Sequence, residues 1–397
     1  MSVLSEEVTD YLKHSSMIRK MFESGIELKK KYGEDRVYDF SLGNPDLPPP
    51  PQIKQALLKL AERADKPFAF GYMPNAGYPE MREKQAAQLS LEQKTAVPAS
   101  DVVMTCGAAG GINALFRAVL SPGDEVMVPA PFFLEYRFYA ENFGAKLKPV
   151  QTDPADFSLD LEAMEQAFSP AVRAVLINSP HNPTGRIYTR KELGELAFLM
   201  TKMERKYGRP IYLVADEPYR FLNFDGVEIP SLFELYEHSV VIGSYSKNLS
   251  LAGERIGFVA VNPAMKEASE LVAGVILTNR ILGFVNAPAI AQMLVMEAIG
   301  SQADLDVYRR RRAAMSKVLN AAGIRYFMPQ GAFYFFPESP VENESEFVAA
   351  LLKERVLAVP GSGFGAKGYF RLAFCVNEKN IENSAPSFLA AMEKIRR

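Results

Sequence analysis

Short apolar runs alternate with helical stretches through the middle of the chain, between about residues 52 and 290. These runs are rich in β-branched residues, as expected of strands that are buried on both faces. The alternation therefore predicts an α/β fold, in which helices cover both faces of a mostly parallel sheet. Ligands of such sheets bind at the carboxyl ends of the strands. The expected strands are Val102–Thr105, Glu125–Val128, Ala174–Ile177, Ile211–Val214, Val240–Ile242 and Ile256–Val261.

The rest of the chain has a different pattern, in which strands and helices are segregated, and this predicts a smaller α+β domain. We expect an N-terminal segment over 1–45 that packs on this small domain, a large ligand-binding domain over 46–290 and the small C-terminal domain over 291–397. The prolines Pro48 to Pro51 predict a connector that is neither helix nor central strand. The expected elements outside the large domain are a helix over 6–32, a strand over 37–43, a long helix over about 287–321, an aromatic segment over 331–336, a helix near 344–355, strands at 357–359 and 369–374, and a final helix.

The composition excludes several classes of function. The chain has 397 residues, of which 48% are apolar and 23% charged, with a formal net charge of −2. This balance predicts no basic surface for nucleic acid, and no apolar run reaches the roughly 18 residues of a membrane span. Three scattered histidines predict no metal site. Cys106 and Cys375 are typical of small buried residues in a reducing cytoplasm, and the first residues do not have the pattern of a signal peptide.

One lysine follows directly after a predicted strand. Lys247 lies between Ser244 and Arg255 in the run Ser244-Tyr-Ser-Lys-Asn-Leu-Ser-Leu-Ala-Gly-Glu-Arg255. A lysine at this edge of a sheet is either a surface charge or a reactive amine, and its neighbours favour the amine. Hydroxyl donors and a planar guanidinium suit a phosphate monoester. A cofactor with both a phosphate and an aldehyde would use the whole segment, and pyridoxal 5'-phosphate (PLP) is that cofactor.

Other strand ends carry polar residues that could contact the same cofactor ring. Asp216 follows the strand Ile211–Val214, where its carboxylate could keep a pyridine nitrogen protonated or could cap the next helix. Tyr219, three residues further, could reach the phenolic oxygen of the ring. Asn182 could donate to that oxygen from the turn Asn182-Pro-Thr-Gly, although such residue pairs also form ordinary turns. His181 is expected on the solvent side of this turn.

Further segments add candidates, each with a structural alternative. Small residues in Thr105–Gly111 join a strand to a helix, which suits either anion binding or close helix–sheet packing. An aromatic ring of Phe132 or Phe133 could stack on a cofactor or belong to the core. Arg371 lies within an apolar strand, so it needs a partner, either a substrate carboxylate or an internal salt bridge. Tyr72 lies in a segment rich in turn residues.

Together these motifs resemble those of the class I and II aminotransferases, which are PLP-dependent enzymes of fold type I such as the aspartate and aromatic aminotransferases. The resemblance covers nearly the whole chain, and the motifs occur in the order typical of the family. It implies that Lys247 forms the Schiff base with PLP and that Asp216 binds the pyridine nitrogen. It also implies that Asn182 and Tyr219 bind the phenolic oxygen. The phosphate would be bound by Ser244, Arg255 and the backbone of Ala108 and Ala109.

The same resemblance implies substrate and partner contacts. Arg371 would bind the α-carboxylate of the substrate, with help from the backbone of Gly43 and the side chain of Asn178. Tyr72 matches a tyrosine that reaches the phosphate in the neighbouring subunit. This match implies a homodimer with shared active sites.

The chain departs from the family pattern in two places. Several family members stack a tryptophan on the cofactor, but this sequence has none, so Phe133 is assigned to that position in preference to Phe132. Ala108 and Ala109 stand where relatives often have serine or threonine. Phosphate binding would then depend on backbone amides, Ser244 and Arg255.

The implied function is transfer of an amino group from an α-amino acid to a 2-oxo acid, with the Lys247 amine moving the α-proton. A PLP-dependent lyase of the same fold, such as a C–S β-lyase, would share every cofactor residue and is the alternative. A non-catalytic PLP-binding regulator is a distant third, because such regulators carry a separate basic DNA-binding domain. The sequence leaves the amino donor open. Arg280 is either a contact for an acidic substrate or a surface charge.

Overall fold

The computed structural model describes residues 3–13 and 17–396 of the chain. These residues form two compact units. The large unit comprises residues 44–305 and 330–332, and the small unit comprises residues 1–43, 306–329 and 333–397. Whether residues 1–45, 46–290 and 291–397 act as the three expected parts of the chain stays a prediction.

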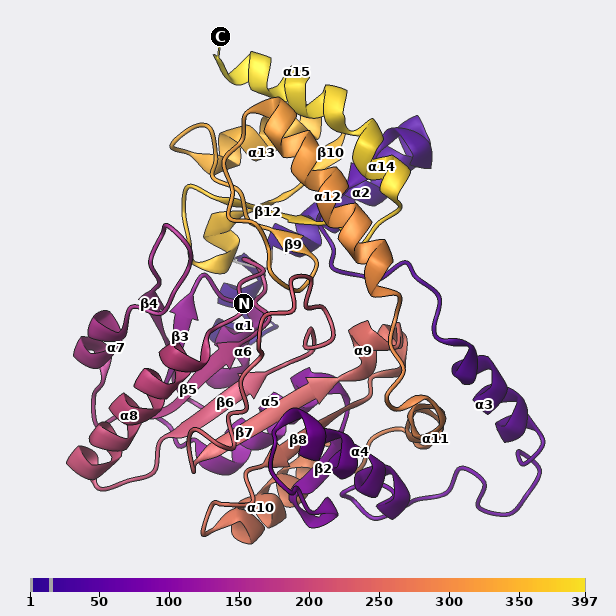
Figure 1. Ribbon diagram of the computed structural model, residues 1–397, viewed down its shortest axis with the longest axis vertical. Coiled ribbons are helices and arrows are strands. Elements are labelled where there is room, and N and C mark those ends of the chain that lie inside the picture. Colours follow the sequence, from indigo (N-terminus) through magenta and orange to yellow (C-terminus); the bar gives the residue numbers. More distant parts are fainter. Residues whose placement is uncertain (1–2, 14–16, 397) are drawn as a thin grey trace. The chain divides into compact units, whose positions relative to one another are not determined.

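A seven-stranded sheet forms the core of the large unit, with the strand order β2-β8-β7-β6-β5-β3-β4 (Figure 1). Strand β8 is antiparallel to both of its neighbours, whereas all other neighbouring pairs are parallel. The predicted mostly parallel sheet is therefore confirmed. The strands are β2 (Val102–Thr105), β3 (Glu125–Ala130), β4 (Lys146–Gln151), β5 (Val172–Asn178), β6 (Tyr212–Asp216), β7 (Ser239–Ser244) and β8 (Gly257–Val261).

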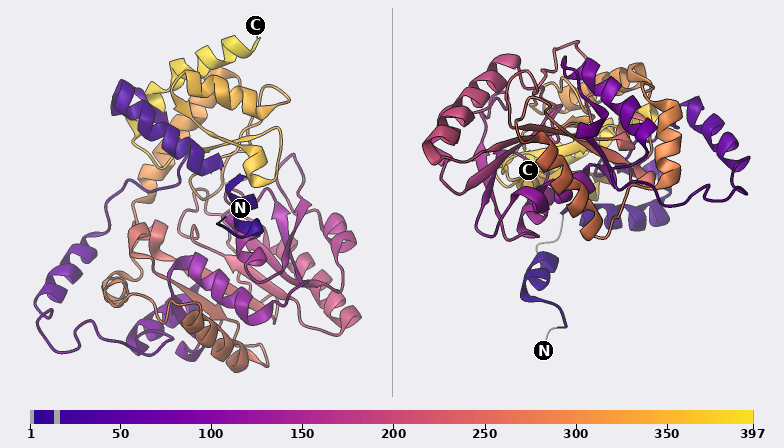
Figure 2. Two further views of the ribbon diagram at one scale, coloured as in Figure 1. Left: turned by 180° about the vertical axis from the view of Figure 1, so that it is seen from behind. Right: turned by 90° about the horizontal axis from the view of Figure 1, so that it is seen from below.

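Helices cover both faces of this sheet (Figures 1 and 2). Successive strand residues point to opposite faces. Val103 accordingly packs in one apolar core with Leu115 and Val275, whereas Met104 packs in the other with Met81. The helices of this unit are α3 (Pro51–Ala61), α4 (Pro79–Glu92), α5 (Gly107–Val119), α6 (Glu135–Glu141), α7 (Leu161–Ala167), α8 (Arg190–Tyr207), α9 (Tyr245–Asn248), α10 (Ala268–Ile281) and α11 (Ala289–Ala298).

Strand β4 was not expected from the sequence. It lies at the edge of the sheet and pairs only with β3. Most of its side chains are at least partly exposed, and Pro149 lies within it. Proline has no N–H to donate, so it is tolerated where one side of a strand is unpaired. An edge strand therefore needs few of the apolar residues by which the other strands were predicted.

The small unit is built around two short sheets. Strand β1 (Tyr38–Asp39) pairs in parallel with β10 (Val356–Leu357), so the N-terminal segment contributes a strand to this unit. An antiparallel sheet has the order β11 (Val359–Pro360), β12 (Phe370–Ala373) and β9 (Tyr334–Phe335). The helices are α1 (Glu6–Lys13), α2 (Met17–Tyr32), α12 (Leu305–Ala322), which begins at the last residue of the large unit, α13 (Glu344–Lys353), α14 (Glu378–Asn383) and α15 (Ala385–Arg396).

The helix expected over 6–32 is present as α1 and α2, and residues 14–16 between them lie outside the described part of the chain. Two other predicted elements differ from the structure. The helix expected over 287–321 is interrupted between α11 and α12, where Gly300 has a left-handed φ of 83°. Pro51 was expected in a non-helical connector but is the first residue of α3. Proline is tolerated there because the first N–H of a helix has no partner within the helix.

Among the described residues, no helix is both long and apolar enough to cross a membrane. The same residues contain no group of three or more histidine, cysteine, aspartate or glutamate side chains that could hold a metal ion.

Candidate active site

Three polar residues end neighbouring strands at one edge of the large sheet. Strand β5 ends at Asn178, β6 at Asp216 and β7 at Ser244. The strand register places Asn178 beside Asp216, and Asp216 beside Ile242 of β7. Because the three strands are parallel, their carboxyl ends meet. The short helix α9, which carries Lys247, begins directly after Ser244, and the Ser244 hydroxyl accepts a hydrogen bond from the Ser246 N–H at 3.0 Å.

The Asp216 carboxylate is buried, and its two oxygens have different surroundings. Oδ2 accepts a hydrogen bond from the Tyr136 hydroxyl at 2.6 Å, whereas Oδ1 has no hydrogen-bond partner among the described residues. Burial raises the pKa of Asp216 to about 6, against the opposing effects of the Tyr136 hydrogen bond and the positive charge of Lys247. Residues 218–221 form a turn, so the alternative role of Asp216 as a helix cap does not apply.

Asn178 connects two of the predicted site residues. Its Nδ2 donates to the carbonyl oxygen of Asp216 at 2.7 Å, and its Oδ1 accepts from the N–H of Asn182 at 2.7 Å. A single buried amide therefore holds the end of β6 and the turn that carries Asn182. The expected contact of Asn178 with the substrate carboxylate stays a prediction.

His181 was expected on the solvent side of this turn, and that expectation was wrong. Its side chain is buried, with 4% exposure. Nδ1 lies 2.8 Å from the Thr184 hydroxyl, and the ring also hydrogen-bonds to the carbonyl of Pro131. Burial lowers the pKa of His181 to about 3, so the imidazole is neutral at physiological pH. His181 thus links the Asn182 turn to the loop that carries Phe133.

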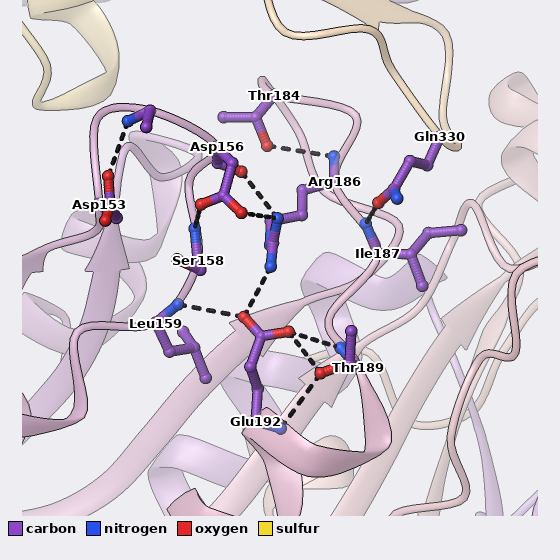
Figure 3. Close-up of polar contacts among 11 residues, drawn as sticks. Asp153, Asp156, Ser158, Leu159, Thr184, Arg186, Ile187, Thr189, Glu192 and Gln330 are labelled. Carbon is purple, nitrogen blue, oxygen red and sulfur yellow. Dashed lines mark hydrogen bonds and ion pairs between the residues drawn. The ribbon is translucent and has the colours of Figure 1, made fainter.

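A buried arginine supports the same turn (Figure 3). Arg186 donates to Oδ2 of Asp156 and to Oε1 of Glu192, each at 2.9 Å. Its carbonyl oxygen accepts from the His181 N–H at 2.8 Å. Glu192 also forms the capping box of α8 with Thr189. Arg186 therefore connects the start of α8 with the turn that carries Asn182.

The start of α5 lies against Arg255 and β8. Gly107, the first residue of α5, has a left-handed φ of 71°, and a Cβ there would lie 2.7 Å from Nη2 of Arg255. A Cβ on Gly257 would lie 2.8 Å from the backbone nitrogen of Ala108. Gly107 needs to be glycine for both its left-handed φ and its close contact, whereas Gly257 needs to be glycine for the close contact alone. Gly257 pairs with Ser244 across β7 and β8. Ser244, Arg255 and the start of α5 therefore form one group of neighbouring residues.

This group has the properties of an anion site. The N–H groups in the first turn of a helix, here those of Gly107, Ala108 and Ala109, have no partners within the helix. They lie beside the Arg255 guanidinium, and both kinds of donor favour a phosphate. The predicted phosphate residues are thus close together although they come from three separate segments.

The aromatic candidates differ in exposure. Phe132 is 5% exposed and belongs to the core, whereas Phe133 is partly exposed and packs edge-on against Tyr136, with 5.6 Å between ring centroids. Tyr219 is buried in the turn after Asp216. Tyr72 is 94% exposed, so the single chain provides almost no packing for its ring.

In the small unit, Arg371 is held between aromatic rings. Its side chain lies on β12 with 2% exposure, and Nη2 donates to the carbonyl of Ser41 at 2.6 Å. The guanidinium lies 4.7 Å from the ring centroids of both Tyr334 and Phe364. The Tyr334 hydroxyl occupies the space where a Cβ on Gly43 would be, so Gly43 and Arg371 share this neighbour.

The fold defines an enzyme of fold type I, because it is similar over its whole length to solved aminotransferases. An amino transferase from Eubacterium rectale is 35% identical, with a TM-score of 0.95 and complete coverage of both chains. Aspartate aminotransferase from Thermus thermophilus with maleate is 27% identical, with a TM-score of 0.87 and coverage of 98% of this chain and 100% of that one. Residues 35–388 match the family described as "Aminotransferase class I and II", and the chain belongs to this family.

Curated relatives agree with this assignment. The aspartate/prephenate aminotransferase of Thermus thermophilus is 32% identical over 374 residues, which cover 91% of this chain and 92% of the relative. A probable aspartate/prephenate aminotransferase of Aquifex aeolicus is 31% identical over 392 residues, covering 93% and 94%. The predicted PLP-dependent aminotransferase function is therefore confirmed. The alternative of a lyase is not favoured, because these relatives are named aminotransferases.

The residues at the sheet edge fit PLP. Oδ1 of Asp216 is a buried acceptor to which none of the described residues donates, as a protonated ring nitrogen requires. The start of α5 and Arg255 form an anion site for a phosphate. The lysine on α9 lies close enough to Asp216 for its charge to lower the pKa of that carboxyl.

Sequence reasoning missed Tyr136 and Arg186. Tyr136 lies in α6 and its ring contacts that of Phe133, but Phe133 precedes the helix, so helical spacing did not connect the two residues. Arg186 directly follows the Asn-Pro-Thr-Gly turn, but nothing local indicates that its partners come from residues 156 and 192.

Proposed function

We propose that Lys247 binds PLP covalently as a Schiff base and that its amine moves the α-proton during transamination. The main support for this proposal is that Lys247, Asp216 and Asn178 lie together at the carboxyl ends of three adjacent parallel strands. When bound, PLP withdraws electrons from the substrate and so stabilises the carbanion that remains after proton loss. The Nζ of Lys247 takes the proton from the substrate Cα. The charge of Lys247 lowers the pKa of Asp216, which supports the position of this amine next to the proposed contact with the ring nitrogen.

Asp216 would hold the ring nitrogen in its protonated form through Oδ1. Asn182 and Tyr219 would bind the phenolic oxygen, and Phe133 would stack on the ring. The partial exposure of Phe133, compared with the buried Phe132, supports this choice. The phosphate would be bound by Ser244, Arg255 and the backbone of Ala108 and Ala109, which the close approach of the start of α5 to Arg255 and Gly257 supports.

Arg371 would bind the α-carboxylate of the amino acid, with Gly43 and Asn178 as helpers. Its guanidinium is buried and fixed by two rings and Ser41, so little side-chain entropy would be lost on binding. We propose aspartate as the amino donor, because relatives along nearly the whole chain are named aspartate aminotransferases. The contact of Arg280 with an acidic substrate stays a prediction; its side chain is exposed at the end of α10.

We further propose a homodimer in the cytoplasm, in which Tyr72 reaches the phosphate bound by the other subunit. The nearly complete exposure of Tyr72 supports a partner for its ring. Cys106 and Cys375 are both free thiols, which is usual in a reducing compartment.

Replacement of Lys247 tests this function. Wild-type protein supplied with PLP should take up one cofactor per chain, and borohydride should fix it to Lys247. Without a 2-oxo acid acceptor it should form at most one oxaloacetate from aspartate per bound cofactor, and continued turnover should require the acceptor. Lys247→Ala should lose the adduct and nearly all activity, whereas Lys202→Ala, at an exposed ion pair, should keep both. Normal transamination by Lys247→Ala would refute the role of Lys247, and release of ammonia without an acceptor would instead indicate a lyase.

A further inference from the structure

Tyr136 has a buried hydroxyl that the proposed reaction does not yet use. It lies in α6, is 2% exposed, and donates to Oδ2 of Asp216 at 2.6 Å. Burial and the negative charge of Asp216 raise the pKa of Tyr136 well above its ordinary value. The hydroxyl therefore keeps its proton at physiological pH and acts as a permanent donor.

Packing fixes the position of this donor. The ring of Tyr136 meets Phe133 edge-on at an interplanar angle of 87°, and Tyr139 at 60° with 6.5 Å between centroids. The ring also belongs to the apolar core on this face of the sheet. A side chain surrounded in this way has one position available for its hydroxyl.

The two oxygens of Asp216 are consequently different. Oδ2 is bound by Tyr136, while the backbone carbonyl of the same residue is bound by Asn178 at 2.7 Å. Oδ1 is buried and has no hydrogen-bond partner among the described residues. Asp216 is thus held at two points, its carboxylate by Tyr136 and its backbone by Asn178, with Oδ1 left as an acceptor.

We propose that Tyr136 is a positioning residue for Asp216, which keeps this carboxylate charged and oriented so that Oδ1 accepts from the ring nitrogen of PLP. The proposal rests on the proposed role of Asp216 in cofactor binding.

The charge state of Asp216 has a measurable effect on PLP binding. Burial favours the protonated carboxyl, and the Tyr136 hydrogen bond and the Lys247 charge oppose it. A protonated Asp216 cannot pair with a protonated ring nitrogen, so PLP affinity should fall as the pH drops through the pKa of Asp216, near 6. Without the donor, that fall should begin at a higher pH.

The test compares PLP affinity of the cofactor-free chain between pH 5 and 8 for wild type, Tyr136→Phe and a control. The control is Tyr236→Phe, which removes another buried tyrosine hydroxyl, one that donates to the carbonyl of Ile211 at 2.8 Å. Titrations of PLP itself are common to all variants and cancel in the comparison. The midpoint is the pH at which half of the loss of PLP affinity has occurred. We expect this midpoint to rise by about one pH unit in Tyr136→Phe, the effect of one hydrogen bond to a charged acceptor. Below the wild-type midpoint, the PLP affinity of Tyr136→Phe should be about tenfold weaker than that of wild type, while Tyr236→Phe should match wild type.

A double-mutant cycle separates a positioning role from a packing role. If Tyr136 acts through Asp216, Tyr136→Phe should not change PLP affinity further when Asp216 is already asparagine. Should Tyr136→Phe fail to fold, 3-fluorotyrosine at position 136 provides a stronger donor without loss of packing, and the midpoint should then fall. Equal midpoints for wild type and the altered position 136 would overturn the proposal.

The outcomes also distinguish this proposal from the proposed function. If wild type forms no borohydride adduct on Lys247, the assignment of Lys247 fails, whatever Tyr136 does. If wild type forms the adduct and Asp216→Asn weakens PLP binding, but the midpoint does not depend on Tyr136, only the positioning role is wrong.

Discussion

The side-chain amide of Asn178 donates to the backbone carbonyl of Asp216 at 2.7 Å, across the ends of two adjacent parallel strands. The oxygen of the same amide accepts from the N–H of Asn182. The residues proposed to contact the ring nitrogen and the phenolic oxygen of PLP, Asp216 and Asn182, are therefore both hydrogen-bonded to Asn178. Asn178 therefore connects the end of β6 with the turn that carries Asn182.

Asn178→Ala should weaken PLP binding. The change removes the amide that donates to a buried carbonyl and accepts from a buried N–H, and the loss of these two hydrogen bonds costs about 2–4 kcal/mol of unfolding free energy. PLP affinity should fall as well, because the Asn182 turn loses its anchor. Asn262→Ala is the control, since this buried asparagine caps the carbonyls of Phe233 and Tyr236. Denaturant unfolding should show that both variants lose stability; unchanged PLP affinity in Asn178→Ala would contradict the role given to it.

Gly107→Ala should disturb the phosphate site specifically. A methyl group there would lie 2.7 Å from Nη2 of Arg255, so the guanidinium must move. Gly123→Ala is a matched control, because Gly123 also has a left-handed φ, of 92°, but no atom lies within 4 Å of its added Cβ. Both changes should cost about 1–2 kcal/mol through backbone strain. Only Gly107→Ala should reduce PLP affinity in a cofactor titration, and similar affinities for the two variants would contradict the phosphate assignment.

Arg371→Lys should raise KM for the amino donor by about 10- to 100-fold, because a lysine cannot form two parallel hydrogen bonds to a carboxylate. PLP binding should be unchanged, since the cofactor contacts proposed here come from other residues. Arg325→Lys serves as the control at an exposed arginine. Steady-state kinetics with aspartate measures both variants. An unchanged KM in Arg371→Lys would rule out a paired contact with the α-carboxylate.

Glu217 should make the protein less stable as the pH rises. Burial raises the pKa of this carboxyl to about 7, despite its bond to Arg220, and the negative charges of Glu92 and Asp216 add to the increase. The folded-state pKa exceeds the unfolded value near 4.5, so the folded state binds more protons between these values. Stability from this group is thus complete below about pH 4.5 and is lost as the pH rises through about 7.

Glu217→Gln removes this contribution. Urea unfolding with saturating PLP should show the variant gaining on wild type by up to about 3 kcal/mol between pH 5 and 8. Glu228→Gln, at an exposed pair with Lys94, should keep a constant difference from wild type over that range. If the Glu217→Gln curve runs parallel to the wild-type curve, the carboxyl is already ionised in the folded state at pH 5.

Much of the fold follows from local sequence. Six strands of the large sheet were predicted because strands that are buried on both faces are continuous apolar runs, and the ends of these strands located Asp216 and Lys247. Strand β4 escaped because an edge strand with Pro149 has no such run. The position of His181 was mispredicted because a turn is usually exposed, whereas here Thr184 and Pro131 bury the imidazole.

The sequence by itself determined the family, the alternating sheet architecture and the order of the cofactor motifs, since each depends on residues that are close along the chain. Only the tertiary structure decided which side chains surround those motifs. Tyr136 and Asp216 are 80 positions apart, and Gly107 approaches Arg255 from another strand end. Contacts of this kind arise when parallel strands and their crossing helices bring distant segments to one edge, and no local pattern records them.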